Sequence, residues 1–578
     1  MGKIHPMGVS VGEKGIQFVF VSRSEECGVI LYDAAGSEKE CIPFPKHCRV
    51  GDVHTMCVSG VEETEFTYAF FEGDRLVWDP FAGKFVGNEE YGCLEGVEGK
   101  RACFAPAEYD WEGDLSPAVP YEEAFVYCMH VRGFTRHESS GVKHRGTFQG
   151  VAEKIPYLKQ LGVTTLELQP IYEFDEVSRE QGRNYWGYTR GYYYAPKNSY
   201  AVGDSRRACK DMIKALHQNG MEAVLQFYFP EDMGQWEILD ILRFWVTEYH
   251  VDGFHIKGQC APMELILGDP CLKGVKLWYY DYDQRLLRAE GNGQKRVGIY
   301  EDTFCRTMRR FLKGEEGMVG PVAEQLRSQP AQAGKINYVT NYEGFTLMDM
   351  VSYERKHNED NGEGNRDGFD YNFTWNCGVE GPSRKKSVVS LRTKQMKNVL
   401  SLLFYAQGTP LIFMGDEFGN SQGGNNNPYC QDNEITWLDW RDLERNRELF
   451  GFVRVLAEFR KNYPGLGRSG KVPMPDDLAC GYPDLSYHGG EPWQADMTPF
   501  SRQLGIMVCG REEFFYLALN MHWEAYTFSL PRLPGGQLWS MWNVTDPECE
   551  LSSGEKGQQI CLKPRSICLL CSREEDSE

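Results

Sequence analysis

The chain lacks the long apolar stretches that membrane proteins need. No run of about 18 or more uninterrupted apolar residues occurs in it, so we expect no segment to span a bilayer. Its first residues, MGKIHPMGVSVGEKG, contain no apolar core of the kind that a secretory signal requires. The sequence therefore predicts a cytoplasmic protein with no membrane partner.

Basic residues are also in deficit. Lys and Arg together number 62, against 83 Asp and Glu, which gives a formal net charge of −21. Nucleic acids and anionic lipid surfaces are polyanions, so such a chain repels them, whereas a neutral polymer is a compatible ligand. We expect no nucleic-acid partner.

Cysteine motifs typical of metal binding are scarce as well. Among the 19 cysteines, only Cys568 and Cys571 have the CxxC spacing, and neither a second such pair nor a pair of histidines lies nearby. This pair lies in an apolar run typical of a buried strand. The scattered cysteines fit reduced, buried thiols better than a disulfide framework. The sequence therefore predicts no metal and no cofactor.

The pattern of apolar residues changes along the chain. Residues 1–115 hold short apolar runs separated by Gly, Pro, Asp and Ser, which is typical of a β-sandwich. Residues 113–120 (GDLSPAVP) have the composition of a linker. From Tyr121, short apolar strands alternate with longer amphipathic stretches, which predicts an α/β fold with a (β/α)8 TIM barrel over residues 121–445. The eight predicted strands are Ala124–Val131, Val163–Leu168, Glu222–Tyr228, Gly253–Ile256, Val275–Tyr280, Val297–Tyr300, Ile336–Thr340 and Leu411–Met414.

Helical periodicity is clearest at residues 206–219. This segment places Met212, Ile213 and Leu216 on one face and ends before Gly220, a residue favoured just after a helix. Further helices are predicted at 238–249, 302–312 and 394–405. Residues 446–578 should contain most of a helix at 443–462, followed by a C-terminal β domain with strands near 504–508, 514–519 and 559–562.

Seven segments of the chain carry a specific resemblance. They are 127–135 (YCMHVRGFT), 146–150 (GTFQG), 155–170 (IPYLKQLGVTTLELQP), 184–188 (NYWGY), 345–353 (FTLMDMVSY), 356–382 (KHNEDNGEGNRDGFDYNFTWNCGVEGP) and 407–440 (QGTPLIFMGDEFGNSQGGNNNPYCQDNEITWLDW). They resemble the isoamylase-type glycogen-debranching family of the α-amylase clan of glycoside hydrolases. The resemblance implies a barrel that acts on α-1,4-linked glucose polymers with α-1,6 branches, preceded by a module in the position of a carbohydrate-binding domain.

The residues that should carry the family's chemistry are replaced. Retaining glycosidases need two carboxyl groups about 5–5.5 Å apart, one as nucleophile and one as general acid. The family's fourth strand reads V-D-G-F-R-F-D and ends in the nucleophile, but residues 251–257 read VDGFHIK, so His255 and Lys257 stand at the Arg and Asp positions. An ammonium group has no lone pair and the wrong charge for an oxocarbenium-like transition state. Residues 275–283 (VKLWYYDYD) place Tyr280 where the fifth strand should end in the acid Glu.

Two further strand ends depart from the family pattern. The His-Asp pair after the seventh strand is Tyr342-Glu343, and the third-strand motif D-x-x-x-N-H reads QFYFPE from Gln226 to Glu231. Changes at four strand ends indicate an abandoned active site, so we expect no intact catalytic residue.

Two acidic residues after Tyr280 are poor substitutes for the missing acid. Asp281 is one step further along the strand and faces the opposite side, and Asp283 lies three residues beyond Tyr280. Because a lysine in place of a carboxylate turns repulsion into attraction, we instead expect Lys257 to pair with Glu343.

The retained NYWGY segment supplies the candidate sugar-binding residues. In the family it lies beside the substrate, so Tyr185, Trp186 and Tyr188 could stack on glucose rings, although packing of the loop would also explain them.

Three functions remain open at this stage. The favoured one is a non-hydrolytic glucan-binding or regulatory subunit that binds glycogen or malto-oligosaccharide and could partner an active debranching enzyme or another glycogen enzyme. The second is an active glycogen-debranching α-1,6-glucosidase with shifted catalytic residues. The third is a structural or interaction protein that no longer binds glucan. Glucan binding without hydrolysis would separate the first function from the other two.

Overall fold

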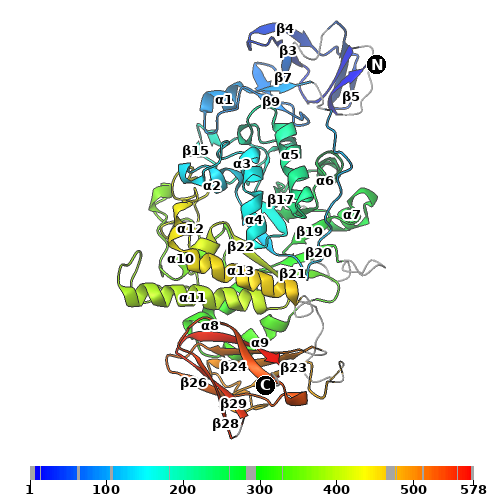
Figure 1. Cartoon of the computed structure of the whole chain (residues 1–578). Helices are drawn as coiled ribbons and strands as arrows, with labels where there is room; N and C mark the ends of the chain where they lie inside the picture. Colours follow the sequence, from blue (N-terminus) through cyan, green and yellow to red (C-terminus); the bar gives the residue numbers. More distant parts are fainter. Residues whose placement is uncertain are drawn as a thin grey trace.

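The computed structural model describes residues 7–12, 15–60, 66–104, 108–180, 182–258, 261–280, 295–328, 330–463, 476, 478, 480–510, 513–555 and 557–574. Over these residues the chain forms three parts that follow one another along the molecule (Figure 1). N-terminal strands lie at one end, a barrel surrounded by helices lies in the middle, and C-terminal strands lie at the other end.

The N-terminal part contains two antiparallel sheets. Phe18, Phe20, Tyr68 and Phe70 are buried in their common core, where the rings of Phe20 and Phe70 stack with centroids 4.4 Å apart. The short apolar runs of the sequence therefore form β structure, as predicted. One sheet has the order β1 (Gly8–Gly12), β2 (Gly15–Val21), β6 (Val53–Val58), β5 (Arg49–Val50), and the other β4 (Glu38–Pro43), β3 (Cys27–Tyr32), β7 (Thr67–Glu72), β10 (Arg101–Cys103), β9 (Phe85–Val86), with β8 (Arg75–Val77) beside β7.

The middle part is a closed barrel of eight parallel strands. The last strand pairs with the first, with Leu411 opposite Val126, so the sheet has no free edge. All eight predicted strands are present, which confirms the TIM-barrel prediction. They are β11 (Val126–Met129), β12 (Thr165–Leu168), β17 (Glu222–Tyr228), β18 (Gly253–Lys257), β19 (Lys276–Tyr279), β20 (Val297–Tyr300), β21 (Gly334–Tyr338) and β22 (Thr409–Phe413).

Helices cover the outside of the barrel (Figure 1). In α5 (Ser205–Gln218), the carboxylate of Asp204 accepts from the first backbone N–H groups, and Met212, Ile213 and Leu216 are buried, as their spacing predicts. The other long helices are α6 (Gln235–Tyr249), α8 (Thr303–Lys313), α9 (Val319–Arg327), α11 (Lys386–Tyr405) and α13 (Arg447–Asn462). Helix α11 starts two turns before the predicted Lys394. The sequence did not predict these two turns, because their residues, KSVVSLRT, include Ser, Val and Thr of modest helix propensity.

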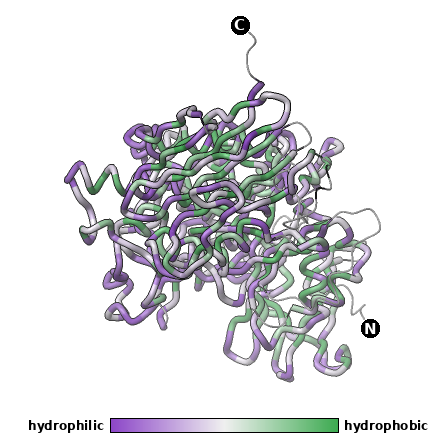
Figure 2. Tube along the Cα trace, turned by 90° about the horizontal axis from the view of Figure 1, so that it is seen from below, coloured by the Kyte–Doolittle hydropathy of each residue, from purple (hydrophilic) through white to green (hydrophobic). Residues whose placement is uncertain are grey.

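The C-terminal part again consists of antiparallel sheets, as predicted, and Cys568 is buried in one of their strands. Hydrophobic residues concentrate inside the molecule and hydrophilic residues on its outer loops (Figure 2). No helix within the described ranges is long and apolar enough to cross a membrane. The five-stranded sheet has the order β23 (Leu485–His488), β24 (Gln503–Cys509), β25 (Phe514–Asn520), β30 (Ser566–Arg573), β27 (Leu538–Val544), and the three-stranded sheet β26 (Tyr526–Ser529), β29 (Gly557–Leu562), β28 (Glu550–Gly554).

Candidate functional site

Most of the site positions predicted from the sequence lie at one end of the barrel. Lys257 is the last residue of β18, and Tyr280 directly follows β19. In the barrel sheet Gln226 pairs with His255, which in turn pairs with Trp278. Because all eight strands are parallel, their carboxyl ends share one face, the face on which barrel enzymes place their active sites.

Lys257 and Glu343 form an ion pair at this face. The Lys257 Nζ lies 3.6 Å from the Glu343 Oε1, within the usual limit of about 4 Å for an ion pair, so the predicted pairing is confirmed. The ammonium also lies 5.2 Å from the centroid of the Tyr342 ring, close enough for a cation–π contact. The lysine side chain is 20% exposed and the glutamate side chain 45% exposed, so solvent screens this attraction.

Aromatic rings fill the space beside this ion pair. Tyr342 is buried and stacks on Tyr188, with centroids 5.3 Å apart and planes 19° from parallel. The Trp186 ring meets the Tyr342 ring edge-on at 5.4 Å and is only 9% exposed. Tyr188 is partly exposed and its hydroxyl donates to the Gln226 side chain. The Tyr188 ring is therefore more accessible than that of Trp186.

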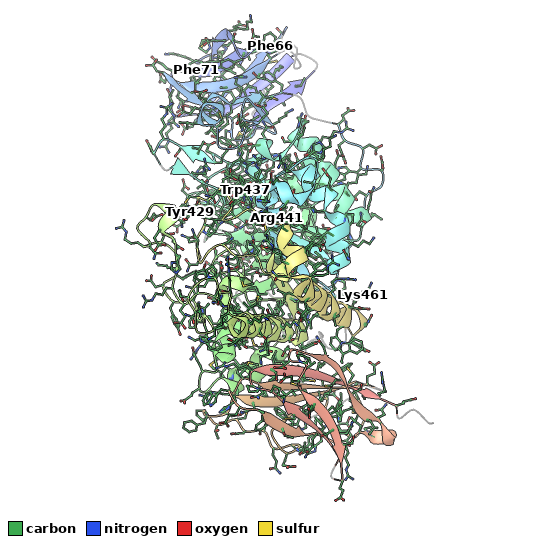
Figure 3. The ribbon with its side chains drawn as sticks, turned by 60° about the vertical axis from the view of Figure 1, so that its left-hand side comes forward. Phe66, Phe71, Tyr429, Trp437, Arg441 and Lys461 are labelled. Atoms are coloured by element: carbon green, nitrogen blue, oxygen red, sulfur yellow. The ribbon has the colours of Figure 1, made fainter. Side chains whose placement is uncertain are left out.

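Tyr185 does not have the exposed ring that sugar stacking needs. It is buried, and its ring stacks on the imidazole of His130 at 4.0 Å. Its backbone N–H donates to the carbonyl of Tyr429, 2.7 Å away, which ties the NYWGY segment to the loop after β22. Tyr429 lies in the barrel part of the molecule (Figure 3). Tyr185 therefore has a packing role in this structure, and its ring is not accessible for stacking on a sugar.

A buried carboxylate that the sequence analysis missed, that of Glu167, bonds two polar side chains inside the barrel near Lys257. Glu167 lies in β12, and its Oε1 is 2.7 Å from the Gln226 Nε2 and 2.5 Å from the His255 Nδ1. Burial, and then the charge of Lys257, lower the pKa of His255, and a neutral imidazole can still donate from Nδ1. The available signal was an acidic residue inside the apolar strand sequence TLEL.

The remaining altered positions lie further out. Tyr280 is 50% exposed, with its ring 4.7 Å from that of Tyr279, and Glu231 is exposed on the loop after β17. Asp281 and Asp283 lie outside the described residues.

Two carboxyl groups described at this face already have partners. Glu343 is paired with Lys257, and Glu167 is buried and bonded to Gln226 and His255. Elsewhere in the part of the chain that the structure describes, no group of three or more His, Cys, Asp or Glu is placed to hold a metal ion.

A closed eight-stranded parallel barrel between two β-rich parts, with polar residues at the carboxyl ends of its strands, places the molecule in the TIM-barrel class. Residues 129–230 match the family model described as "Alpha amylase, catalytic domain". The chain is 32% identical to the glycogen operon protein GlgX homolog of Haemophilus influenzae, over 95% of this chain and 97% of that protein. It is 30% identical to the chloroplastic isoamylase 1 of Arabidopsis thaliana, over 92% of this chain and 83% of that protein. The chain belongs to the isoamylase-type glycogen-debranching family, as the sequence predicted.

Solved structures of low sequence identity share the fold. The apo pullulanase from Paenibacillus barengoltzii superposes with a TM-score of 0.72 at 18% identity, over 98% of this chain and 94% of that chain. The catalytic module of the pneumococcal glycogen-degrading virulence factor SpuA gives a TM-score of 0.74 at 16% identity, over 100% and 98% of the two chains. These matches agree with a barrel flanked by β-rich parts.

Proposed function

We propose that this protein is an α-glucan-binding member of the isoamylase family that does not hydrolyse glycosidic bonds and acts as a glucan-binding or regulatory subunit. The observation that carries the proposal is the ion pair between Lys257 and Glu343 at the end of β18. Lys257 stands at the position of the family's nucleophile, and its ammonium can neither attack an anomeric carbon nor stabilise positive charge on the reacting sugar.

The position of Tyr280 supports the same conclusion. It follows β19 where the family's general acid should stand, and a phenol is a far weaker acid than a carboxyl group. Loss of a general acid alone slows such reactions by about 10²–10⁴-fold, and the altered nucleophile position adds to that loss.

The names of the relatives support an α-glucan as the ligand of this protein. The Haemophilus relative is named for a glycogen operon and the Arabidopsis relative is an isoamylase, and this chain covers most of both proteins. The partly exposed ring of Tyr188 and the rim around Lys257 are the surfaces of the barrel site that a glucan would reach. An active debranching enzyme or another glycogen enzyme is the protein partner that we propose.

A combined binding and hydrolysis assay tests this function. Purified protein should sediment with glycogen but release no reducing ends from glycogen, amylopectin or pullulan above the level of a Lys257→Ala variant. The variants Glu343→Gln, Asp281→Asn and Asp283→Asn should give the same result as the unmodified protein.

Two outcomes would contradict the proposal. Hydrolysis that disappears in the Glu343, Asp281 or Asp283 variant would identify an active debranching enzyme with shifted carboxylates. Failure to sediment with glycogen, in a protein that is folded by circular dichroism, would indicate a structural or interaction role without glucan.

A further inference from the structure

A surface pocket of about 370 Å³ lies in the C-terminal part, remote in sequence from the barrel site. It is formed by Tyr482, which precedes β23, by the loop after β23, by the end of β26 with the residues that follow it, and by the start of β29. These strands lie at the end of the molecule opposite the N-terminal sheets (Figure 1). The residues that matter for its chemistry are Tyr482, Glu491, Trp493, Arg532 and Gln559.

Two aromatic rings form one wall of this pocket. The rings of Tyr482 and Trp493 lie 5.6 Å apart with planes only 4° from parallel, as in an offset stack. The hydroxyl of Tyr482 donates to the carbonyl of Arg532, 2.7 Å away, and its ring packs edge-on against Phe514. Tyr482 is thereby fixed, whereas Trp493 remains 46% exposed to solvent.

Trp493 has a backbone conformation that is unfavourable for a bulky side chain. Its φ is +67°, in the left-handed region that glycine adopts freely and that is strained for other residues. The Trp493 N–H donates to the Nδ1 of His488, 2.9 Å away, and the Nε2 of His488 lies 2.9 Å from the Ser486 hydroxyl. Burial lowers the pKa of His488 to about 4, so the imidazole is neutral at physiological pH and its Nδ1 can accept this bond.

Strain of this kind persists where the surrounding structure enforces it, and it concentrates at binding sites. Here the enforced conformation holds an indole in solvent, an arrangement that folding alone does not favour because an apolar ring gains by burial. Tyr482 and His488 cover part of the Trp493 ring, at centroid distances of 5.6 and 4.8 Å, and the face that they leave in solvent is free to receive a ligand.

We infer that this pocket is a second α-glucan-binding site, distinct from the barrel. The flat C–H face of a glucose unit would lie on the Trp493 ring, next to Tyr482. Arg532, Glu491 and Gln559 supply a guanidinium, a carboxylate and an amide that can bond sugar hydroxyls. One positive and one negative side chain suit a neutral polyhydroxylated ligand better than a charged one. The choice of an α-glucan rests on the proposed function, whereas the pocket does not depend on it.

Titration of the protein with maltoheptaose tests the inference. Calorimetry with the unmodified protein should show binding that Trp493→Gly weakens by about tenfold or more at this site, since loss of an aromatic stacking platform has an effect of that order. Trp523→Ala is the matched control, because Trp523 is an exposed tryptophan of the same part (58%) that does not line the pocket. This control should bind like the unmodified protein.

The glycine variant also separates a binding role from a structural one. Because glycine adopts a φ of +67° without strain, Trp493→Gly should melt at a higher temperature than Trp493→Ala, while both lose affinity. Gln559→Ala keeps both rings and should weaken maltoheptaose binding to a smaller extent.

The possible results distinguish this inference from the proposed function. Binding of maltoheptaose that is identical in the unmodified protein, Trp493→Gly and Gln559→Ala would overturn the second site and leave the proposed function intact. Weakened binding in Trp493→Gly together with reducing-end release would support the second site and overturn the non-hydrolytic function. Binding of a proline-rich peptide at this pocket, with no binding of maltoheptaose, would overturn the inference.

Discussion

At the scale of single residues, the proposed function places Lys257 at the nucleophile position and Tyr280 at the acid position. Restoring one of them should not restore the reaction, because cleavage needs both carboxyl groups. We expect Lys257→Asp to release no detectable reducing ends from glycogen in an overnight assay. An active Lys257→Asp variant would mean that a carboxyl group elsewhere at this face, and not Tyr280, serves as the acid.

The ion pair between Lys257 and Glu343 should stabilise the protein only weakly. The Glu343 side chain is 45% exposed, and pairs that solvent reaches contribute between about 0 and 1 kcal/mol. A double-mutant cycle with Lys257→Met, Glu343→Gln and the double variant should therefore give a coupling energy below about 1 kcal/mol. The free energies of unfolding from urea titrations provide the measurement, and a coupling well above this value would show that the pair is more desolvated than its exposure indicates.

At the scale of elements, a histidine joins a helix, the linker and a strand at the other end of the barrel. His217, in the last turn of α5, lies between two carboxylates: its Nδ1 is 2.7 Å from the Asp114 Oδ2, and its Nε2 is 3.0 Å from the Asp252 Oδ2. Asp114 belongs to the linker, where His250 also contacts it at 3.1 Å, and Asp252 precedes β18. Burial alone would lower the pKa of His217, but Asp252 and Asp114 together raise it above 6.5.

This arrangement predicts a pH dependence of stability. A histidine with a raised pKa in the folded state contributes stability that is complete below its unfolded pKa and is lost as the pH rises through its folded pKa. The stabilisation that His217 contributes should therefore be lost as the pH increases from about 6.5, so the difference in free energy of unfolding between the unmodified protein and His217→Gln should shrink over this range. Urea titrations over this range measure the effect. His522→Gln, in the C-terminal part, is the control and should keep the pH dependence of the unmodified protein.

Elements were more predictable from the sequence than the details of the site. The barrel strands are apolar and short, and α5 carries a regular buried face, so local patterns determine them. The pairing of Lys257 with Glu343 also followed from charge. By contrast, the burial of Tyr185 depends on His130, and the network around Glu167 depends on residues from three neighbouring strands. Contacts between distant segments leave no periodic signal in a single sequence.

At the scale of the whole molecule, the C-terminal part docks on the barrel through arginines that bond the end of α8. Arg565 donates to the carbonyls of Leu312 and Lys313 at 3.1 and 3.3 Å, and Arg502 donates to the carbonyl of Gly314 at 2.6 Å. Cations are favoured there, because the last carbonyls of a helix lack partners within the helix and carry partial negative charge.

Removal of one of these arginines should weaken the docking. We expect Arg565→Ala to lower the free energy of unfolding by about 1.5–3 kcal/mol, the range for hydrogen bonds to charged groups. Differential scanning calorimetry should show a lower melting temperature or a separate early transition of the C-terminal part. Arg573→Ala, at the exposed end of β30, is the control and should have the melting temperature of the unmodified protein. Equal melting temperatures of the unmodified protein, Arg565→Ala and Arg573→Ala would mean that apolar packing alone holds the two parts together.

The pocket at Trp493 and the barrel site belong to different parts of the same chain, and this separation has a consequence for selectivity among polymers. Two modest sites on one molecule bind a particle with many neighbouring chains far more tightly than either binds a short oligosaccharide, because the first contact raises the effective concentration at the second. This gain in affinity depends on how closely the glucan chains are spaced. It disappears when a single chain is too short to reach both sites and no second chain lies close enough to reach the other site. The affinity of such a protein would depend on the density of glucan chains on a surface more than on the length of any single chain.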